Sequence, residues 1–375
     1  MELYIYDRNL EMVGIIDTAS DVIWHRRYFT SGDFEIHTPA TDITLELIKK
    51  QYIIKKSDSV EFGIIESLIL EQREDGEYIK ASGRFGSSLL GRRIIMERTT
   101  LNTTVEEAMR ELVYNNAIDI SGLLLFSDTL LFSDDLLFVA NRSIPKLELG
   151  DVNGYTEEVS FQVTYKNLLV KLEELAKTSG ISYRIRFDDI NKKFIFETYK
   201  ALDRSAAQSV NPRAIFSNDY ETLLTSTYQT TDQQHSNVVL VGGEGEDELR
   251  KLVTLGGDEG LDRYEVFVDA KDIRMEDGMT LEEYNALLSQ KGYESLIPVS
   301  EWFEGNVISN GNLIYKTDYD LGDIVTIENS KWGIRINVRI TEITEVYDAN
   351  GVTIVPIFGS TLPLISDIIS IVRSV

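Results

Sequence analysis

The sequence predicts a mostly β protein of the α+β class, with two all-β regions around a mixed α+β region. Three observations indicate this class. Short apolar-rich runs follow one another closely through the first hundred residues, a helical period appears after residue 101, and strand-like runs resume after residue 223. Closely spaced strands of this kind are typical of a small barrel or sandwich. With 375 residues, 43% of them hydrophobic, the chain can build two or three packed domains.

The first region consists of paired strands. Residues 2–17 predict a hairpin with its turn near residues 7–9. Two further apolar-rich runs cover residues 51–57 and 60–70, and residues 74–76 (Glu-Asp-Gly) separate the second run from the next. An Asp-Gly pair between such runs indicates a tight hairpin, because both turn positions tolerate a positive φ.

The stretch from residue 24 to residue 40 carries Trp, Arg and His side chains, which at first suggest a binding or catalytic site. Its pattern instead predicts a strand, a turn at residues 30–33 and a second strand. Trp24 and Phe34 are bulky strand formers that we assign to the core, and Gly32 serves the turn.

Arg26 and Arg27 are neighbours in the first of these strands, so their side chains point to opposite faces of the sheet. One of them is therefore solvated, and the other can pair with a carboxylate inside the barrel or across a subunit contact. Alternation assigns the two faces only relative to each other, so the sequence leaves open which arginine makes the contact.

The middle region combines helices and strands. Thr104 and Glu107 have the spacing of a capping box at the start of a helix. A second helix can begin at Thr164 and end at Gly180, with apolar residues at helical spacing between them. Two strand-like runs follow on either side of residues 188–191, and a helix before a hairpin is typical of an α+β domain.

The last region is strand-rich and is interrupted by one helix. Thr280 and Glu283 form another capping box, and Gly292 ends that helix. Strands resume after it, and Asn350-Gly351 predicts a hairpin turn between two of them.

Two apolar segments stand apart from these regions. Residues 123–138 repeat Leu-Leu-Phe every six residues, and we interpret them as a duplicated strand or loop rather than a ligand surface, since so few copies cannot form a solenoid. Residues 361–375 place apolar side chains on one helical face, which has to be buried on the chain itself or on a partner. We therefore expect four parts: a first β-barrel (1–100), an α+β domain (101–222), a second β-barrel (223–360) with a helical insertion at about 271–300, and a C-terminal apolar helix (361–375).

Composition excludes several classes of protein. The chain has no cysteine, which excludes disulfides, thiolate nucleophiles and iron–sulfur clusters, and its three histidines show no zinc-binding spacing. A net charge of −25 argues against sequence-specific nucleic-acid binding, because so acidic a surface repels phosphate. No apolar run approaches the roughly 20 residues of a membrane helix, and the start lacks a signal-peptide pattern. We expect a soluble protein made in the cytoplasm.

No motif supports catalysis or cofactor binding. Residues 242–246 (Gly-Gly-Glu-Gly-Glu) lack the Lys-Ser/Thr of a phosphate loop and are better interpreted as a hairpin tip. Residues 188–191 and 247–248 could ligate calcium but lack the alternating oxygen spacing of an EF-hand loop. With 62 acidic residues, carboxylate pairs are too common to indicate a glycosidase. We therefore expect no catalytic residues, no metal and no cofactor.

The order of several short motifs resembles the tail-hub proteins of siphophages and prophages of Gram-positive bacteria, which form the N-terminal hub of Tal-type tail-associated baseplate proteins. The similarity covers nearly the whole chain. Its motifs include Trp24, Arg26-Arg27-Tyr28, Gly32-Asp33-Phe34, Pro39, Gly63-Ile64-Ile65-Glu66, Gly83-Arg84, Leu89-Leu90, Arg92-Arg93-Ile94-Ile95, Tyr165, Asn167-Leu168-Leu169, Gly180, Gly322-Asp323-Ile324-Val325, Arg339-Ile340-Thr341-Glu342, Gly351, Pro356 and Phe358-Gly359.

This resemblance implies a trimeric hub related to the baseplate hubs of contractile tails, in which two β-barrels per subunit form a ring of six. The implied role is structural, at the virion tail tip, where the hub closes the tail tube and anchors host-recognition proteins. The implied partners are a homotrimer, a distal tail protein, a tape-measure protein and receptor-binding or fibre proteins. Candidate residues for hub or subunit contacts are Trp24, Arg26, Arg27, Gly32, Phe34, Arg84, Arg92 and Arg93.

Two further expectations follow from the resemblance. Part of the acidic surface would line a channel through which DNA passes without sticking. Many relatives carry a C-terminal fibre or peptidoglycan hydrolase, whereas this chain ends at Val375, as a short hub or as part of something longer. We therefore do not expect wall cleavage, and the alternative function is a cell-wall-active tail protein, either a hydrolase or a carbohydrate-binding module.

Overall fold

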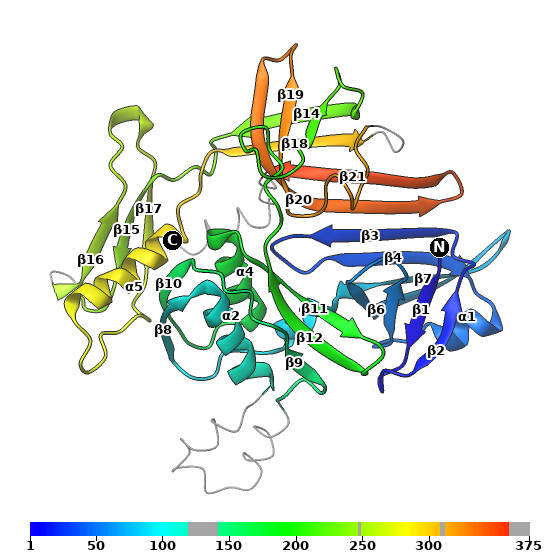
Figure 1. Cartoon of the computed structure of the whole chain (residues 1–375). Helices are drawn as coiled ribbons and strands as arrows, with labels where there is room; N and C mark the ends of the chain where they lie inside the picture. Colours follow the sequence, from blue (N-terminus) through cyan, green and yellow to red (C-terminus); the bar gives the residue numbers. More distant parts are fainter. Residues whose placement is uncertain (119–141, 247–248, 308–311, 360–375) are drawn as a thin grey trace, which may run out of the picture.

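The computed structural model describes residues 1–118, 142–246, 249–307 and 312–359. It is mostly β, as the sequence predicts, with large antiparallel sheets and a few helices (Figure 1). The predicted repeat at residues 123–138, the predicted helix at 361–375 and the acidic pair at 247–248 lie outside the described residues. Within the described residues, no helix is long and apolar enough to span a membrane.

The N-terminal lobe is built from seven strands and two short helices. These are β1 (Leu3–Tyr6), β2 (Met12–Ile16), β3 (Asp21–Arg27), β4 (Asp33–Pro39), α1 (Asp42–Leu47), β5 (Ile53–Lys56), β6 (Phe62–Arg73), β7 (Gly76–Phe85) and the 3-10 helix η1 (Gly86–Arg92). The predicted hairpins are confirmed: β1 pairs with β2, β3 with β4 and β6 with β7, all antiparallel. The last turn uses Glu74 and Asp75, and Gly76 already opens β7 with φ +150°. Helix α1, which the sequence analysis did not predict, begins with a capping box at Thr41.

The region that follows, here called the middle domain, combines helices and strands. Its elements are β8 (Thr99–Thr104), α2 (Val105–Val113), the π-helical turn η2 (Tyr114–Ile118), β9 (Leu147–Leu149), β10 (Glu158–Val163), α4 (Leu168–Ser179), β11 (Ser182–Asp188) and β12 (Lys193–Tyr199). Thr104 caps α2 as predicted, and Gly180 ends α4 in a left-handed conformation. The predicted cap at Thr164 is wrong, because α4 begins later and Asn167 accepts the hydrogen bond from Val170.

The C-terminal lobe returns to strands. Its elements are β13 (Ile215–Ser217), β14 (Leu223–Thr231), β18 (Ser300–Val307), β19 (Ile324–Asn329), β20 (Ile334–Asp348) and β21 (Gly351–Gly359). The predicted hairpin at Asn350-Gly351 joins β20 to β21, with Asp348 opposite Gly351.

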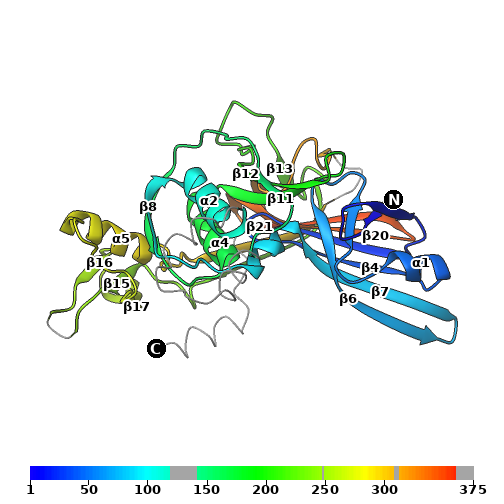
Figure 2. The same cartoon turned by 90° about the horizontal axis from the view of Figure 1, so that it is seen from below.

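Between β14 and β18 the chain builds a separate unit, here called the inserted lobe (residues 232–299). It contains β15 (Val238–Gly242), β16 (Leu252–Leu255), the 3-10 turn η5 (Gly260–Asp262), β17 (Glu265–Asp269) and α5 (Leu281–Tyr293). The capping box predicted at Thr280 and Glu283 is confirmed. The sequence predicted a helical insertion, but the interruption also includes a three-stranded sheet in the order β16-β15-β17. In both views this lobe and the N-terminal lobe lie at opposite ends of the molecule (Figures 1 and 2).

One sheet joins the two outer β regions. Its strand order is β14-β18-β21-β20-β3-β4-β7-β6-β5-β1-β2, with β19 paired to β20 and β13 to β19. The sequence predicted two β-barrels, but among the described strands this order is open at both ends. The reason is that β3 and β20 pair with each other along residues 22–27 and 342–347, so the first and last regions share a sheet.

The apolar core is divided in a way that matches these units. Trp24 and Phe34 belong to a core inside the N-terminal lobe, and Phe216 and Phe358 to one inside the C-terminal lobe. The core of the middle domain also includes Phe62 and other side chains of the N-terminal lobe, so these two units are packed as one. The inserted lobe has a small core of its own.

Candidate functional site

The stretch that attracted attention in the sequence lies where the lobes meet. Strand β3 pairs with β4 on one side and with β20 on the other. Arg26 is thereby opposite Ile343, and Arg27 is opposite Glu342. Figure 1 shows β3 and β20 side by side. We call the charged side chains gathered at this pairing the charged seam; they are those of His25, Arg26, Arg27, Lys56, Glu342 and Glu345.

Arg26 is the buried member of the arginine pair. Its guanidinium donates to Glu61 at 2.8 and 2.9 Å, to the Tyr315 hydroxyl at 2.7 Å and to Asp320 at 2.7 Å. Burial opposes the ionisation of Glu61, but attraction to Arg26 and the hydrogen bonds from Arg26 outweigh it and lower the pKa of Glu61 to about 2. Arg26 therefore ties β3 to both the N-terminal lobe and the C-terminal lobe.

A second ion pair in the seam is fully buried. Lys56, at the end of β5, donates to Glu345 of β20, and neither side chain is exposed to solvent. The hydroxyl groups of Tyr347 and Tyr315 also donate to Glu345, at 2.6 and 2.8 Å. Lys56 also pairs with the partly exposed Asp58 at 2.6 Å, and Lys316 lies 3.7 Å from Glu345. Because both charges of the pair have left water, removal of Glu345 would leave Lys56 without its buried counter-charge, at a cost of about 3–5 kcal/mol.

His25 and Arg27 occupy the outer side of the same pairing. The His25 Nε2 atom lies 2.6 Å from Glu342, and Nδ1 lies 3.7 Å from Asp33. Arg27 pairs with the same two carboxylates and is partly exposed. Burial and the nearby Arg27 guanidinium oppose the charged imidazolium, but the carboxylates of Asp33 and Glu342 outweigh both and raise the pKa of His25 above 6.5.

Trp24, Gly32 and Phe34 support the seam from within the core. Trp24 is fully buried, with its ring 4.6 Å from that of Phe85 and 5.7 Å from that of Phe34. A Cβ atom at Gly32 would lie 2.3 Å from the His25 carbonyl oxygen and 2.6 Å from the Phe85 ring. Glycine is therefore required at residue 32 because the backbone and Phe85 approach closely.

Tyr28 extends the junction to the middle domain. Its hydroxyl donates to the Gly180 carbonyl at 2.9 Å, its own carbonyl accepts from the Ser182 hydroxyl, and its backbone N–H donates to Thr341 at 2.9 Å. The guanidinium of Arg339 lies 5.0 Å from the centre of the Tyr28 ring. Residues 24–28 therefore contact the N-terminal lobe, the middle domain and the C-terminal lobe.

The other three candidate arginines lie away from the seam. Arg84 and Arg92 both donate to Glu66 on the exposed surface of the N-terminal lobe, at 2.8 to 3.3 Å. Arg93 instead donates to the backbone carbonyls of Arg142 and Ser143 in the middle domain. The structure thus brings together Trp24, Arg26, Arg27, Gly32 and Phe34 but not Arg84, Arg92 and Arg93. As candidates for subunit contacts, all eight residues stay predictions.

Sequence reasoning missed the partners of Arg26 and the Lys56–Glu345 pair. A signal for Glu345 is present, because strand alternation places it on the same face as Ile343, which is fully buried. Lys56 likewise ends an apolar strand whose neighbours Ile53 and Ile54 are buried. No local signal identifies Tyr315 or Asp320, since both lie between strands of the C-terminal lobe.

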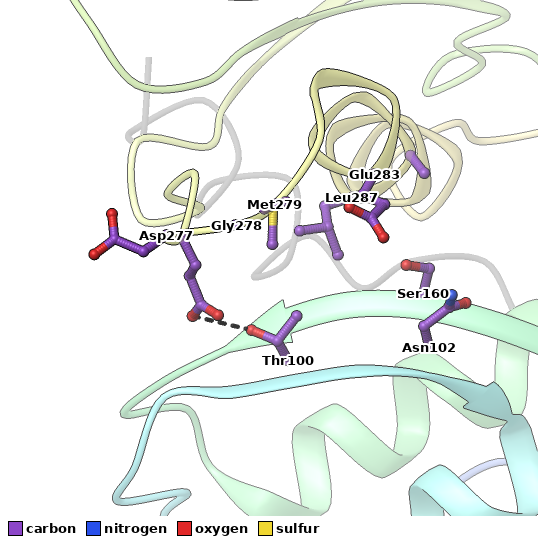
Figure 3. Close-up of a pocket in the computed structure, with 10 residues that line it drawn as sticks. Thr100, Asn102, Ser160, Asp277, Gly278, Met279, Glu283 and Leu287 are labelled. Carbon is purple, nitrogen blue, oxygen red and sulfur yellow. Dashed lines mark hydrogen bonds between the residues drawn. The ribbon is translucent and has the colours of Figure 1, made fainter.

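A cleft separates the middle domain from the inserted lobe. It has a volume of about 340 Å³, with Thr100, Asn102 and Ser160 on one wall and residues 276–279 and α5 on the other (Figure 3). Glu276 accepts from the Thr100 hydroxyl at 3.3 Å and from Gln162 at 3.2 Å. Among the described residues no group of three or more His, Asp or Glu side chains could hold a metal ion. The cleft is lined by both polar and apolar side chains, with Met279 and Leu287 on the wall formed by the inserted lobe.

Comparison with known proteins identifies relatives for this arrangement. The family described as Siphovirus ReqiPepy6 Gp37-like protein matches residues 2–360. No curated protein matches the chain. The structure is similar to a 43 kDa tail protein of prophage MuSo2 from Shewanella oneidensis, with a TM-score of 0.56, 14% identity and coverage of 96% of this chain and 98% of that one.

Two other solved structures show the same likeness. A tail protein from Neisseria meningitidis MC58 has a TM-score of 0.56 and 11% identity, with 96% of each chain covered. Prophage tail protein gp18 from Listeria monocytogenes EGD-e has a TM-score of 0.54 and 11% identity, with 100% of this chain and 99% of that one covered. At these identities the likeness shows a shared fold.

Proposed function

The chain belongs to the Siphovirus ReqiPepy6 Gp37-like family of siphovirus tail proteins, and on this basis we propose that it is the structural hub of the tail tip. The observation that carries the proposal is the pairing of β3 with β20, which joins the first and last β regions into one sheet. A hub has to keep its β units in fixed relative positions while force acts on the tail. A continuous sheet with buried ion pairs across the joint meets this requirement.

In the proposed assembly, three copies form a ring at the end of the tail tube. The N-terminal and C-terminal lobes take the places of the two barrel units of each hub subunit, so the ring presents six related units to a six-fold tube. The likeness over the full length of three solved tail proteins supports this assignment of the fold. Trp24, Gly32 and Phe34 would fix the β3–β4 unit, and Arg26 and Arg27 the joint between lobes.

The role proposed for the chain is assembly and later opening, without bond-making chemistry. Its partners in the tail would be two further copies of itself, the distal tail and tape-measure proteins, and receptor-binding or fibre proteins. Part of the surface that gives the chain its net charge of −25 would line the channel and repel passing DNA. A neutral or basic channel wall in the assembled particle would contradict this part of the proposal.

Cryo-electron microscopy of purified particles tests the proposal directly. The chain, carrying a C-terminal affinity tag bound by a gold-labelled antibody, is expected at the end of the tail opposite the capsid, in three copies per particle. Label along the tube, on the capsid, or in six copies would overturn the hub assignment. A zymogram of the purified chain on host cell walls checks the alternative, since a clear band would indicate a wall hydrolase.

A further inference from the structure

The sheet of the inserted lobe has one covered face and one uncovered face. Helix α5 packs on the inner face, where Val239, Val241 and Leu255 would surround a Cβ atom placed at Gly292 of the helix. Val239 and Val241 are fully buried there. Because side chains alternate along a strand, the residues between them point away from α5.

The outer face carries large apolar side chains. Leu240 of β15 lies opposite Phe267 of β17 in the register, and Leu252 of β16 lies opposite Gly242. Their exposed fractions are 37% for Leu240, 52% for Phe267 and 55% for Leu252. Three such neighbours on one face of a small sheet form a contiguous apolar patch, which is typical of a surface that another molecule covers.

A positioned arginine completes this patch. The Arg250 guanidinium lies 5.2 Å from the centre of the Phe267 ring, donates to the Gly242 carbonyl at 2.9 Å and pairs with Asp269. A Cβ atom at Gly242 would lie 2.6 Å from this guanidinium, so a side chain there would displace the arginine. An aromatic ring and a held arginine are the residue types that contribute most to binding at protein interfaces. The arginine also loses little freedom when a partner binds, because it is already fixed.

The charge of the inserted lobe indicates what kind of partner fits. Residues 232–299 contain sixteen Asp and Glu against six Lys and Arg, so a net charge of −10 out of −25 lies on this part of the chain. Glu265 and Asp269 flank Phe267 on the outer face of β17. A second copy of the chain would bring the same negative charge to the patch, and nucleic acid or anionic lipid would be repelled.

We propose that the outer face of the inserted lobe, centred on Leu240, Leu252, Phe267 and Arg250, is a docking surface for a different protein. The partner surface has apolar side chains at its centre and Lys or Arg around them. The acidic rim steers this partner and excludes other copies of the chain, while the apolar centre supplies the affinity. This inference does not depend on the place of the chain in a virion.

A peptide probe separates this surface from general attraction between opposite charges. The full chain is titrated with a hexapeptide of alternating Arg and Trp, and with hexa-arginine as the purely cationic control. The key variant is Phe267→Asp, which adds negative charge and so strengthens any non-specific attraction to either peptide. Loss of the apolar centre is expected to weaken binding of the Arg–Trp peptide by about tenfold or more. Leu252→Asp is the second variant. The matched control is Ile190→Asp, because Ile190 is also an exposed apolar residue but lies in the middle domain, away from the patch.

Labelling of a single cysteine then locates the bound peptide. The chain has no native cysteine, so Leu252→Cys reacts with a maleimide at one place only. Fast labelling of the free chain and protection by the Arg–Trp peptide are expected. Equal or tighter binding of the Arg–Trp peptide by Phe267→Asp would overturn the proposal, whereas hexa-arginine should bind this variant at least as tightly as it binds the native chain. So would slow labelling of the free chain, because the face would then be covered by the chain itself. Self-association that Phe267→Asp abolishes would also overturn it, by identifying the occupant as a second copy.

Discussion

The charged seam and the outer face of the inserted lobe distribute charge and apolar surface in opposite ways. In the seam, Lys56 and Glu345 are fully buried between two lobes. On the inserted lobe, Leu252 and Phe267 are about half exposed. A buried ion pair contributes little net stability over an apolar pair, but it tolerates only the arrangement that satisfies both charges. We interpret the seam as a permanent joint that fixes alignment and the outer face as a surface that a partner completes.

The two regions also differ in how they are attached. The seam follows six residue pairs between β3 and β20 inside one continuous sheet. The inserted lobe has its own core and touches the middle domain through polar side chains, including the pair Lys171–Glu294 at 3.0 Å. Opening the seam would break a sheet, whereas opening the lobe contact would break side-chain contacts but no pairing between described strands. We therefore expect the lobe contact to open more readily than the seam.

The largest effect is expected when the seam loses one buried charge. Glu345→Ala leaves Lys56 without its buried carboxylate and also removes the acceptor of the Tyr315 and Tyr347 hydroxyls. We expect the free energy of unfolding to fall by about 3–5 kcal/mol. Urea denaturation followed by circular dichroism measures it.

A paired replacement checks that the loss comes from an unpaired charge. In Lys56→Met with Glu345→Leu, neither charge of this pair remains buried without its partner, so most of the lost stability should return. If the single variant loses less than about 1 kcal/mol, or the double variant unfolds as easily as the single one, the seam does not depend on this pair.

A smaller and more local effect is expected at the contact of the inserted lobe. Lys171→Met removes the charge that holds Glu294, and the lobe can then swing away so that Glu294 reaches water. We expect the free energy of local opening to fall by about 1.5–3 kcal/mol, the contribution of a hydrogen bond to a charged group. Hydrogen exchange at residues 238–242 measures it, with the amides of β3 unchanged.

Lys177→Met is the control for this variant, because Lys177 lies on the same helix and is exposed. It should leave exchange in both regions unaltered. Faster exchange along β3 in Lys171→Met would show that lobe and seam open together, and the distinction between a movable and a permanent contact would fail.

The sequence predicted most of the strands, hairpins and helix ends in these two regions, but not how the strands are arranged in the sheet. Strand alternation and Gly180 identify the hairpins and the end of α4, because these depend on neighbours in the chain. The pairing of β3 with β20 joins residues more than three hundred positions apart, such as Arg26 and Ile343. Nothing local encodes that choice, so two barrels were expected where one open sheet formed.

The same limit applies to the candidate residues. Trp24, Gly32 and Phe34 could be assigned to the core because bulky strand formers and a turn glycine have local patterns. The partners of Arg26 could not be predicted, because Glu61 and Asp320 come from distant loops and the sequence contains 62 acidic residues. The patch on the inserted lobe was missed because the apolar residues of a half-exposed strand face look the same in sequence as those of a buried face. Only the packing of neighbouring elements distinguishes the two.

Gly32→Ala tests the packing behind the seam. The added methyl group would collide with the His25 carbonyl and the Phe85 ring, and overpacking of this kind costs about 1–3 kcal/mol. Gly257→Ala in the inserted lobe is the matched control, because a Cβ atom there meets nothing within 4 Å. Thermal unfolding should show a lower melting temperature for Gly32→Ala and almost no change in melting temperature for Gly257→Ala. Equal shifts would mean that the seam is no more tightly packed than the lobe.

The smallest expected effect is the pH dependence that His25 gives the seam. Arg27 on the same strand, Asp33 on β4 and Glu342 on β20 face its ring. Attraction to both carboxylates outweighs burial and the repulsion from Arg27, so the pKa of His25 in the folded chain exceeds its ordinary value of 6.5. The charged imidazole therefore stabilises the fold fully below pH 6.5, and this contribution disappears as pH rises through the folded-state pKa.

His25→Gln should remove this dependence, because glutamine can still donate to Glu342 but carries no charge. Between about pH 5.5 and about pH 8.5 we expect the unfolding free energy of the native chain to fall by less than about 1 kcal/mol. The unfolding free energy of the variant should fall by a smaller amount than that of the native chain. Asp33 and Glu342 remain ionised throughout this range, since the pKa of each is lowered in the fold despite burial, by hydrogen bonds with His25 and by Arg27. Parallel profiles for the two proteins would show that the outer side of the seam, unlike Lys56 and Glu345, does not hold the lobes together through charge.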